Sequence, residues 1–225
     1  MVIRILVEGG VISPNPTLSP ASNGMIAQNS AQLRQSLNEF FSSLFRRNDI
    51  EIKVTVASGK NEAYKQFVSK QVDDYFYVDL DRKPINRNDW FLEMDKVIAA
   101  SPQRKSEVFF WIQEMEAWFL KQPSALNKWT DNENILRVGD IDLANDSQII
   151  GKTPSQIENM QHKPSRVLSA IFKRHLIIRK NGKDRTLVYG KLRHAPGIIR
   201  FLDPQDLMLK DNELANFYQQ VTSNV

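Results

Sequence analysis

The sequence predicts an α/β protein: a mainly parallel sheet with helices on both faces. Three observations support this fold class. Apolar runs of strand length alternate with segments of helical spacing over residues 1–120, and such alternation is typical of parallel strands joined by helical crossovers. Three of the apolar runs end in carboxylates. In parallel sheets, functional side chains gather beyond the carboxyl ends of the strands, so these acids are expected at one edge.

The elements of the first half follow from their apolar patterns. Residues 50–57 alternate between apolar and polar and are β-branched, which predicts a strand. Residues 25–47 have apolar residues at helical spacing, after a loop over 13–23 that is rich in Pro, Ser and Asn. The other strands are predicted at 3–7, 75–81 and 108–112, and the other helices at 61–72 and 88–100.

Beyond Pro123 the pattern is looser. Residues 131–146 are polar and loop-like, 154–172 contain a helical pattern, and 203–221 are predicted to be helical. A turn is expected at Asn181-Gly182, between two short β-rich stretches. We therefore expect a catalytic core over residues 1–125 and an α-rich, basic elaboration over 126–225 that packs on this core.

Charge is unevenly distributed along the chain. Residues 152–200 hold twelve Lys and Arg against two acids, a balance of +10, whereas residues 1–120 hold fourteen basic and fifteen acidic residues. A basic block of this kind can be a solvated surface. A phosphate-rich partner accounts for the segregation better, because Lys and Arg that neutralise phosphates release counterions on binding. We expect that partner to be nucleic acid, either DNA or RNA.

Composition excludes several classes of site. The chain has no cysteine, which rules out disulfides, zinc-thiolate centres and thiol nucleophiles. No apolar run approaches eighteen residues, so no transmembrane helix is predicted. The first strand begins within three residues of Met1, which leaves no room for a signal peptide. We expect a cytoplasmic protein without a membrane partner.

The strand-end acids predict a metal site. Asp79 and Asp81 follow a hydrophobic strand in an Asp-x-Asp pattern, Glu8 ends the first strand, and Glu114 or Glu116 follows the strand at 108–112. Alternate residues of a strand share a face, and like charges set close together repel unless a cation lies between them. Carboxylate oxygens suit Mg²⁺ or Mn²⁺. The alternative is that Asp79 and Asp81 cap the following turn and Glu8 is merely exposed.

Three stretches resemble a known family. The order strand-Glu8-Gly9 and then strand-Asp79-x-Asp81 resembles the Toprim fold, a Rossmannoid fold shared by topoisomerases, DnaG-type primases and OLD-family nucleases. More closely, parts of the chain resemble an uncharacterised bacterial Toprim-related family often encoded beside ABC-type ATPases. The stretches are Ser58-Gly59-Lys60 with residues 63–67, residues 113–120 with a Met-Glu-x-Trp-Phe signature, and residues 189–194, similar to a Tyr-x-Lys-Gly-x-His segment.

This resemblance implies a set of functional residues. Glu8, Asp79 and Asp81 correspond to the metal-linked acids, and Glu116 to a further one. It also implies a role in anti-phage defence and an ABC-type ATPase partner. The chain departs from the family at two places: no second acid follows Gly10, and Leu192 stands where a glycine is expected after Lys191.

Candidate phosphate-binding residues lie in the basic block. They are Lys152, Lys191, Arg193 and His194. The alternative is that they are ordinary surface or core polar residues. Trp118 and Phe119 have two interpretations as well, and packing of the first helical turn against the sheet is favoured over base stacking.

The leading functional hypothesis is an Mg²⁺- or Mn²⁺-dependent nuclease with Glu8, Asp79, Asp81 and Glu116 as catalytic and metal-binding residues. One alternative is a non-catalytic nucleic-acid-binding or regulatory subunit of an ATPase complex. Another is an Asp-x-Asp enzyme acting on nucleotide sugars, in which Glu8 and the basic block have no natural role. A homodimer is a further candidate assembly.

Overall fold

Four parallel strands form the central sheet of the molecule. The structure, a computed structural model, describes residues 1–9, 20–57, 59–70, 72–97 and 104–224. The strands are β1 (Val2–Glu8), β2 (Glu51–Ala57), β3 (Tyr75–Asp79) and β4 (Val108–Trp111), in the order β2-β1-β3-β4. All three strand pairs are parallel. The predicted α/β class with a parallel sheet is therefore confirmed, and the arrangement is consistent with a Rossmann-like fold.

β3 and β4 are buried throughout because both faces of the sheet are covered there. Successive side chains of a strand point to opposite faces, and the two hydrophobic clusters divide the strand residues accordingly. Ile5, Tyr77 and Phe109 belong to one cluster. Leu6 and Phe76 belong to the other. This double burial gives β3 and β4 continuous apolar runs, whereas β2, at the edge of the sheet, alternates between exposed polar and buried apolar residues.

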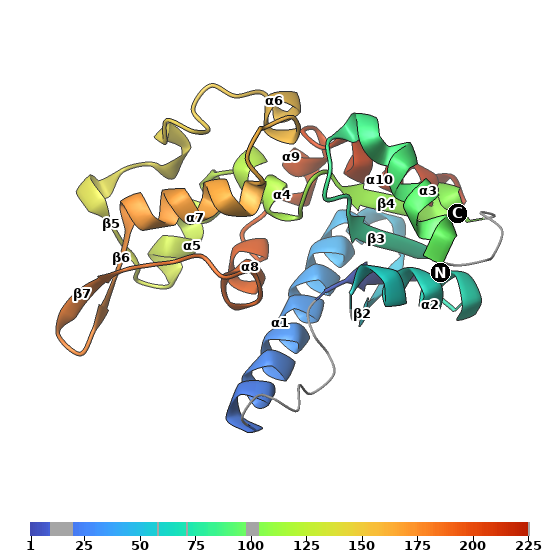
Figure 1. The fold of residues 1–225 in the computed structure, drawn as a ribbon, viewed down its shortest axis with the longest axis horizontal. Helices are drawn as coiled ribbons and strands as arrows, with labels where there is room; N and C mark the ends of the chain where they lie inside the picture. Colours follow the sequence, from blue (N-terminus) through green and yellow to red (C-terminus); the bar gives the residue numbers. More distant parts are fainter. Residues whose placement is uncertain (10–19, 58, 71, 98–103, 225) are drawn as a thin grey trace.

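Helices from both ends of the chain cover one face of the sheet. Here α1 (Pro20–Leu44) packs beside the final helix α10 (Asn212–Ser223). Phe217 of α10 lies 5.7 Å from Tyr77 and 5.6 Å from Phe41, measured between ring centroids. The opposite face is covered by α2 (Lys60–Lys70) and α3 (Arg87–Val97) (Figure 1). The last helix of the chain is thus part of the sheet's own packing layer.

A buried aspartate fixes α10 in place. Asp211 caps the helix by accepting from the Leu214 N–H at 2.9 Å. Its other oxygen accepts from Trp118 Nε1 at 2.9 Å and from Lys121 Nζ at 2.7 Å. The Lys121 side chain is fully buried and that of Asp211 is 1% exposed. The pair therefore ties the end of the chain to the segment that follows β4.

The remaining elements form a second group beside the sheet (Figure 1). A small antiparallel sheet has the order β5-β6-β7. Its strands are β5 (Leu136–Arg137), β6 (Leu176–Lys180) and β7 (Lys183–Thr186). The helices of this group are α4 (Glu116–Lys121), α5 (Ser124–Asn132), α6 (Pro154–Glu158), α7 (Pro164–His175) and α8 (Lys191–Ile199). The short helix α9 (Pro204–Met208) packs against α1 and α10 instead. One hydrophobic cluster contains residues of both groups. The predicted boundary between a core over residues 1–125 and an elaboration over 126–225 stays a prediction.

Some predicted bounds were wrong. The first long helix begins at Pro20, within the expected loop, and ends at Leu44; the rest of that loop lies outside the described residues. The 131–146 segment contains β5 and two short 3₁₀ turns, and 203–221 divides into two helices. The turn at Asn181-Gly182 is confirmed.

Within the described ranges, no helix is both long and apolar enough to span a bilayer.

Candidate functional site

The carboxyl ends of β1, β3 and β4 bring the predicted acids to one edge of the sheet. Glu8 is the last residue of β1 and Asp79 the last of β3, and these two strands are neighbours. Gly9 follows Glu8 because a Cβ at this position would come within 2.8 Å of Val56 Cγ1 on β2. Glu116 begins α4, directly beyond β4. Sheet topology therefore gathers these three acids, as the strand-end pattern predicts.

A lysine from α8 lies between two of the acids. Lys191 Nζ donates to Asp79 Oδ2 and lies 3.8 Å from Glu116 Oε2. Asp79 Oδ1 also accepts from the Met115 N–H at 2.8 Å. Burial alone would lower the pKa of Lys191, but Asp79, Glu116 and Glu8 outweigh it and hold the pKa well above its ordinary value. The ammonium therefore stays charged at the centre of the cluster.

The same burial acts on the carboxylates. It raises the pKa of Glu8 from 4.5 to about 7, and the negative charge of Asp79 adds to this effect. Burial also raises the pKa of both Asp79 and Glu116 above the ordinary range, while Lys191 opposes the shift. Buried acids whose pKa values are displaced by one another and by a shared cation are typical of functional sites.

Glu116 is oriented by a buried tyrosine. Glu116 is fully buried, and its Oε1 accepts from the Tyr189 hydroxyl at 2.9 Å. Its other oxygen, Oε2, has no hydrogen-bond partner among the described residues, and the same is true of Glu8 Oε2. An unpartnered buried carboxylate oxygen is costly. Two such oxygens in one cluster indicate that a cation or donor belongs there.

Asp81 lies at the rim of the cluster, on a strained turn. Its backbone is left-handed (φ 59°), as is that of Gln113 (φ 62°). The Asp81 N–H donates to the Gln113 carbonyl at 2.7 Å, which joins the segments leaving β3 and β4. Lys163 Nζ lies 2.9 Å from Asp81 Oδ1 and Lys60 Nζ 3.8 Å from Oδ2. Non-glycine residues in this region cluster at functional sites, where surrounding contacts hold them.

Glu114 and Glu116 have different roles. Glu114 Oε2 accepts from the Ser165 N–H at 2.9 Å, at the start of α7, and its Oε1 lies 3.4 Å from Lys163 Nζ. Glu114 therefore accepts a hydrogen bond from the backbone of the first turn of α7 and does not join Asp79. Glu116 is the acid that joins the cluster.

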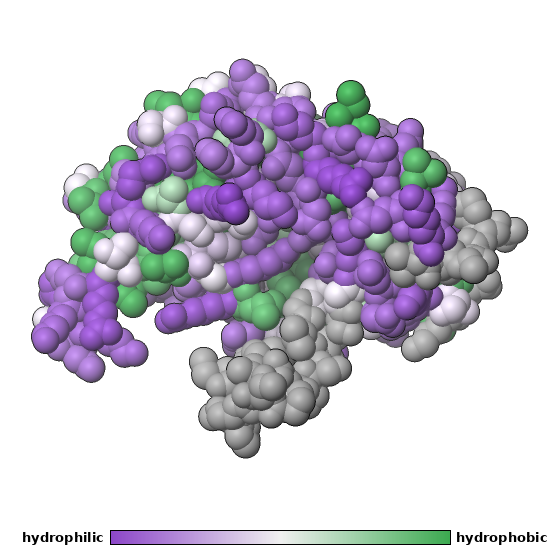
Figure 2. All heavy atoms as spheres, viewed as in Figure 1, coloured by the Kyte–Doolittle hydropathy of each residue, from purple (hydrophilic) through white to green (hydrophobic). Residues whose placement is uncertain are grey.

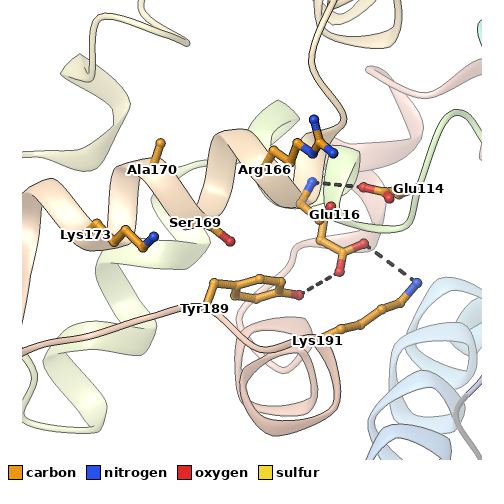
Figure 3. Close-up of a pocket in the computed structure, with 9 residues that line it drawn as sticks. Glu114, Glu116, Arg166, Ser169, Ala170, Lys173, Tyr189 and Lys191 are labelled. Atoms are coloured by element: carbon orange, nitrogen blue, oxygen red, sulfur yellow. Dashed lines mark hydrogen bonds and ion pairs between the residues drawn. The ribbon is translucent and has the colours of Figure 1, made fainter.

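A cavity of about 540 Å³ opens beside the cluster. Glu116, Tyr189 and Lys191 line one side, and α7 lines the other with Arg166, Ser169 and Lys173 (Figure 3). The three α7 residues lie three and four positions apart, which places them on one face of the helix. The cavity therefore combines a carboxylate wall with a wall that carries two cations.

The acids do not converge on a single point as the side chains lie. Within the described ranges, no group of three or more His, Asp or Glu residues is arranged to hold one metal ion. The cation nearest to Asp79 and Glu116 is the Lys191 ammonium. The all-oxygen donor set and the two unpartnered oxygens nevertheless match the requirements of Mg²⁺ or Mn²⁺.

The predicted phosphate-binding residues are dispersed. Only Lys191 lies at the carboxylates. Lys152 borders a separate cleft with His162, and Arg193 and His194 border another with Trp129. Trp118 and Phe119 are buried in the core, so the packing interpretation is confirmed.

Sequence reasoning missed several residues of the site. Tyr189, Lys163, Arg166 and Lys173 were not singled out beyond belonging to a resembling stretch or to the basic block. The Pro164 that starts α7 is a recognisable helix-start signal. It indicates where the helix begins but not that its first turn rests on Glu114.

Comparisons with protein-family models, with curated protein sequences and with solved structures found no match to this chain. The geometry of the site therefore carries the functional conclusion.

Proposed function

We propose that the protein is a metal-dependent nuclease of the Toprim type that hydrolyses phosphodiester bonds in nucleic acid. One observation carries the proposal: at the edge of the parallel sheet, Asp79 and Glu116 both lie within ion-pair distance of the Lys191 ammonium, and Glu8 is close enough to raise the pKa of this lysine. This cluster opens on a cavity whose opposite wall carries Arg166 and Lys173. Acids that hold a cation, beside cations that can hold a phosphate, are the two parts that such a reaction requires.

The donor set fits a hard divalent cation. Glu8 Oε2 and Glu116 Oε2 are buried oxygens without a hydrogen-bond donor in the described part of the chain. Asp79 Oδ2 already accepts a hydrogen bond from the Lys191 ammonium. Glu8, Asp79, Asp81 and Glu116 are the residues that would hold the ion. When bound, Mg²⁺ or Mn²⁺ would polarise the phosphoryl group and neutralise the charge that develops during in-line attack.

The protein's own groups then have distinct roles. Arg166 and Lys173 would hold the phosphodiester against the carboxylate wall, because both line the cavity opposite Glu116. Tyr189 fixes the orientation of Glu116 by donating to its Oε1. The pKa of Glu8 is about 7 without an ion, so binding of the ion by this carboxylate would release a proton at neutral pH.

The resemblance of residues 58–67, 113–120 and 189–194 extends this proposal. It supports a place in an anti-phage defence system and an ABC-type ATPase as partner, in the cytoplasm. Both parts follow from the resemblance alone.

Cleavage of plasmid DNA and total RNA tests the proposal. The wild type is expected to cleave one of them with Mg²⁺ or Mn²⁺ and not with EDTA, because the carboxylates act through the ion. An Asp79→Asn variant and an Asp79→Ala, Asp81→Ala double variant should lose cleavage by several hundredfold or more, of the order seen when a group that stabilises charge in the transition state is removed.

A matched control is Asp89→Asn, which changes an exposed acid on α3. It should cleave like the wild type. Full activity in both Asp79 variants would exclude the proposed site.

A second function is favoured by one specific observation. Lys191 and Lys163 already neutralise Asp79 and Asp81 without an added ion. A nucleic-acid-binding subunit that does not catalyse cleavage would need no metal ion, and these two lysines would remain paired with the aspartates. It predicts salt-sensitive binding in EDTA that is unchanged by Asp79→Asn, together with no cleavage by the wild type under any metal.

A further inference from the structure

A two-stranded ribbon projects from the second group of elements. β6 and β7 are joined by Asn181 and Gly182, both left-handed (φ 54° and 72°). Two consecutive left-handed residues are typical of a type I′ hairpin turn. Residues 179–186 are all exposed, and the hairpin extends from the body as a hydrophilic arm, at the left of Figures 1 and 2.

The charges on the ribbon are sorted by face. Cross-strand partners share a face, and the partners are Arg179 with Asp184 and Lys180 with Lys183. Arg179 Nε lies 2.9 Å from Asp184 Oδ1, so the charges on that face compensate each other. The other face, which we term the cationic face, carries Lys180, Lys183 and Arg185. Within the described part of the chain, none of these three forms an ion pair.

The cationic face is unfavourable for the protein alone. Lys180 lies directly opposite Lys183, and like charges opposite each other destabilise a strand pair. An anion bound to the face would turn this repulsion into attraction. The face therefore has the character of a binding surface.

The same face leads into a cleft with more cations. Ile178 is the cross-strand partner of Arg185 and borders a cleft of about 420 Å³. Arg193 of α8 and Arg200, which follows this helix, border the same cleft, as does one acid, Glu133. In the described part of the chain, Arg200 forms one ion pair, with Glu39 at 3.9 Å, and both side chains are exposed. Positive charge thus continues from the ribbon to the body of the molecule.

We infer that the cationic face binds double-stranded DNA. Five residues of β6 extend about 17 Å at about 3.3 Å per residue, and the B-DNA major groove, about 12 Å wide and 8.5 Å deep, admits a two-stranded ribbon. The major groove of duplex RNA is too narrow and deep for such an element. This rests on the proposed function only in taking nucleic acid as the ligand. It adds that the substrate is a duplex and that the ribbon holds it.

Binding without cleavage tests the inference. The full chain is titrated with a fluorescent DNA duplex of about two helical turns in EDTA, at several salt concentrations. The test variant combines Lys180→Gln, Lys183→Gln and Arg185→Gln. Three lost phosphate contacts should reduce the slope of log K against log salt by about 2.7, at about 0.9 per contact. From about 50 to 200 mM salt, wild-type binding should therefore weaken about 40-fold more than that of the variant.

The other face of the same ribbon supplies the matched control. Arg179→Gln with Asp184→Asn changes two exposed residues without changing net charge, and should bind duplex DNA like the wild type. All substituted positions are exposed, so both variants should fold, and the triple variant should melt no lower than the wild type because it removes the Lys180–Lys183 repulsion.

Two outcomes would overturn the inference. One is equal duplex binding by the triple variant and the wild type. The other is equal or tighter wild-type binding to single-stranded DNA or to duplex RNA of the same sequence. Failure of the nuclease proposal looks different, because duplex binding through the ribbon would persist in EDTA while no metal supports cleavage.

Discussion

Burial determines the protonation state of His194. The ring packs near Trp129, Phe172 and Tyr189, and its Nδ1 accepts from the Gly190 N–H at 2.9 Å. Burial and the positive charge of Arg193 lower the pKa of His194 from 6.5 to about 4. A neutral ring that accepts a backbone hydrogen bond stabilises the start of α8, the helix that also carries Lys191.

His194 should therefore make stability depend on pH. Between pH 6.5 and about 4, the unfolded chain binds a proton at His194 and the folded chain does not. Its contribution is present above pH 6.5 and is lost as the pH falls toward 4, by up to about 3 kcal/mol. Urea unfolding of the wild type and of His194→Asn at pH 7 and pH 4.5 measures this. The difference between the two proteins should shrink at the lower pH; a constant difference would contradict a buried neutral histidine.

At the residue scale, the sequence predicts part of the site. Glu8 and Asp79 were found because each ends an apolar strand, and parallel topology then brings them together. The Lys191 contact with Asp79 joins residues 112 positions apart. Such a contact depends on how α8 packs beside the sheet, which no local pattern encodes.

At the scale of the elements, the N-cap of α10 is buried and has several partners. Asp211 serves the backbone of α10, the indole of Trp118 and the ammonium of Lys121, all in the interior. Without Asp211, the buried Trp118 N–H has lost its acceptor, and Lys121 keeps Glu158, at 2.6 Å, as its acid partner within the described residues. Buried polar and charged groups that lose a partner are costly.

Asp211→Ala should accordingly cost about 3–5 kcal/mol of unfolding free energy. Asp203→Ala is the matched control, because Asp203 caps α9 from an exposed position and such a cap contributes about 1 kcal/mol. Urea unfolding of both variants gives the comparison. Equal losses would mean that the Lys121 contact contributes nothing beyond the cap.

Element type was easier to predict than element extent. β3 and β4 are continuous apolar runs because they are buried on both faces, and β2 alternates because one of its faces is exposed; both signals are strong. The start of α1 was missed because Pro20 lies in a segment whose Pro, Ser and Asn content is typical of loops. Proline at a first helical position is favourable, so loop composition and helix start coincide there.

On the scale of the whole molecule, one hydrophobic cluster joins the two ends of the chain. Ile5 of β1 and Val221 of α10 belong to it, together with residues of α7 and α8. The predicted boundary at residue 125 cuts through this cluster. The helices that cover the sheet therefore come from both sides of residue 125, and they share one core with the elements beside the sheet.

A fragment of residues 1–125 should not fold cooperatively. It lacks Phe217, which contacts Phe41 and Tyr77 over the face of the sheet, and that aromatic face would be open to water. Thermal unfolding followed by near-UV circular dichroism, beside the full chain, measures this. A sharp transition in the fragment would show that residues 1–125 form an independent domain.

The position of α10 also has a consequence in time. A ribosome makes the chain from its N-terminus at about 5–20 residues per second, and 106 residues separate Trp111 of β4 from Phe217 (217 minus 111). For about 5–20 seconds, every nascent copy therefore carries the aromatic residues of β3 and β4 without Phe217, which later packs on them. Apolar surface that is exposed in this way is prone to aggregation, so the late arrival of α10 makes the unfinished chain more vulnerable than the folded protein.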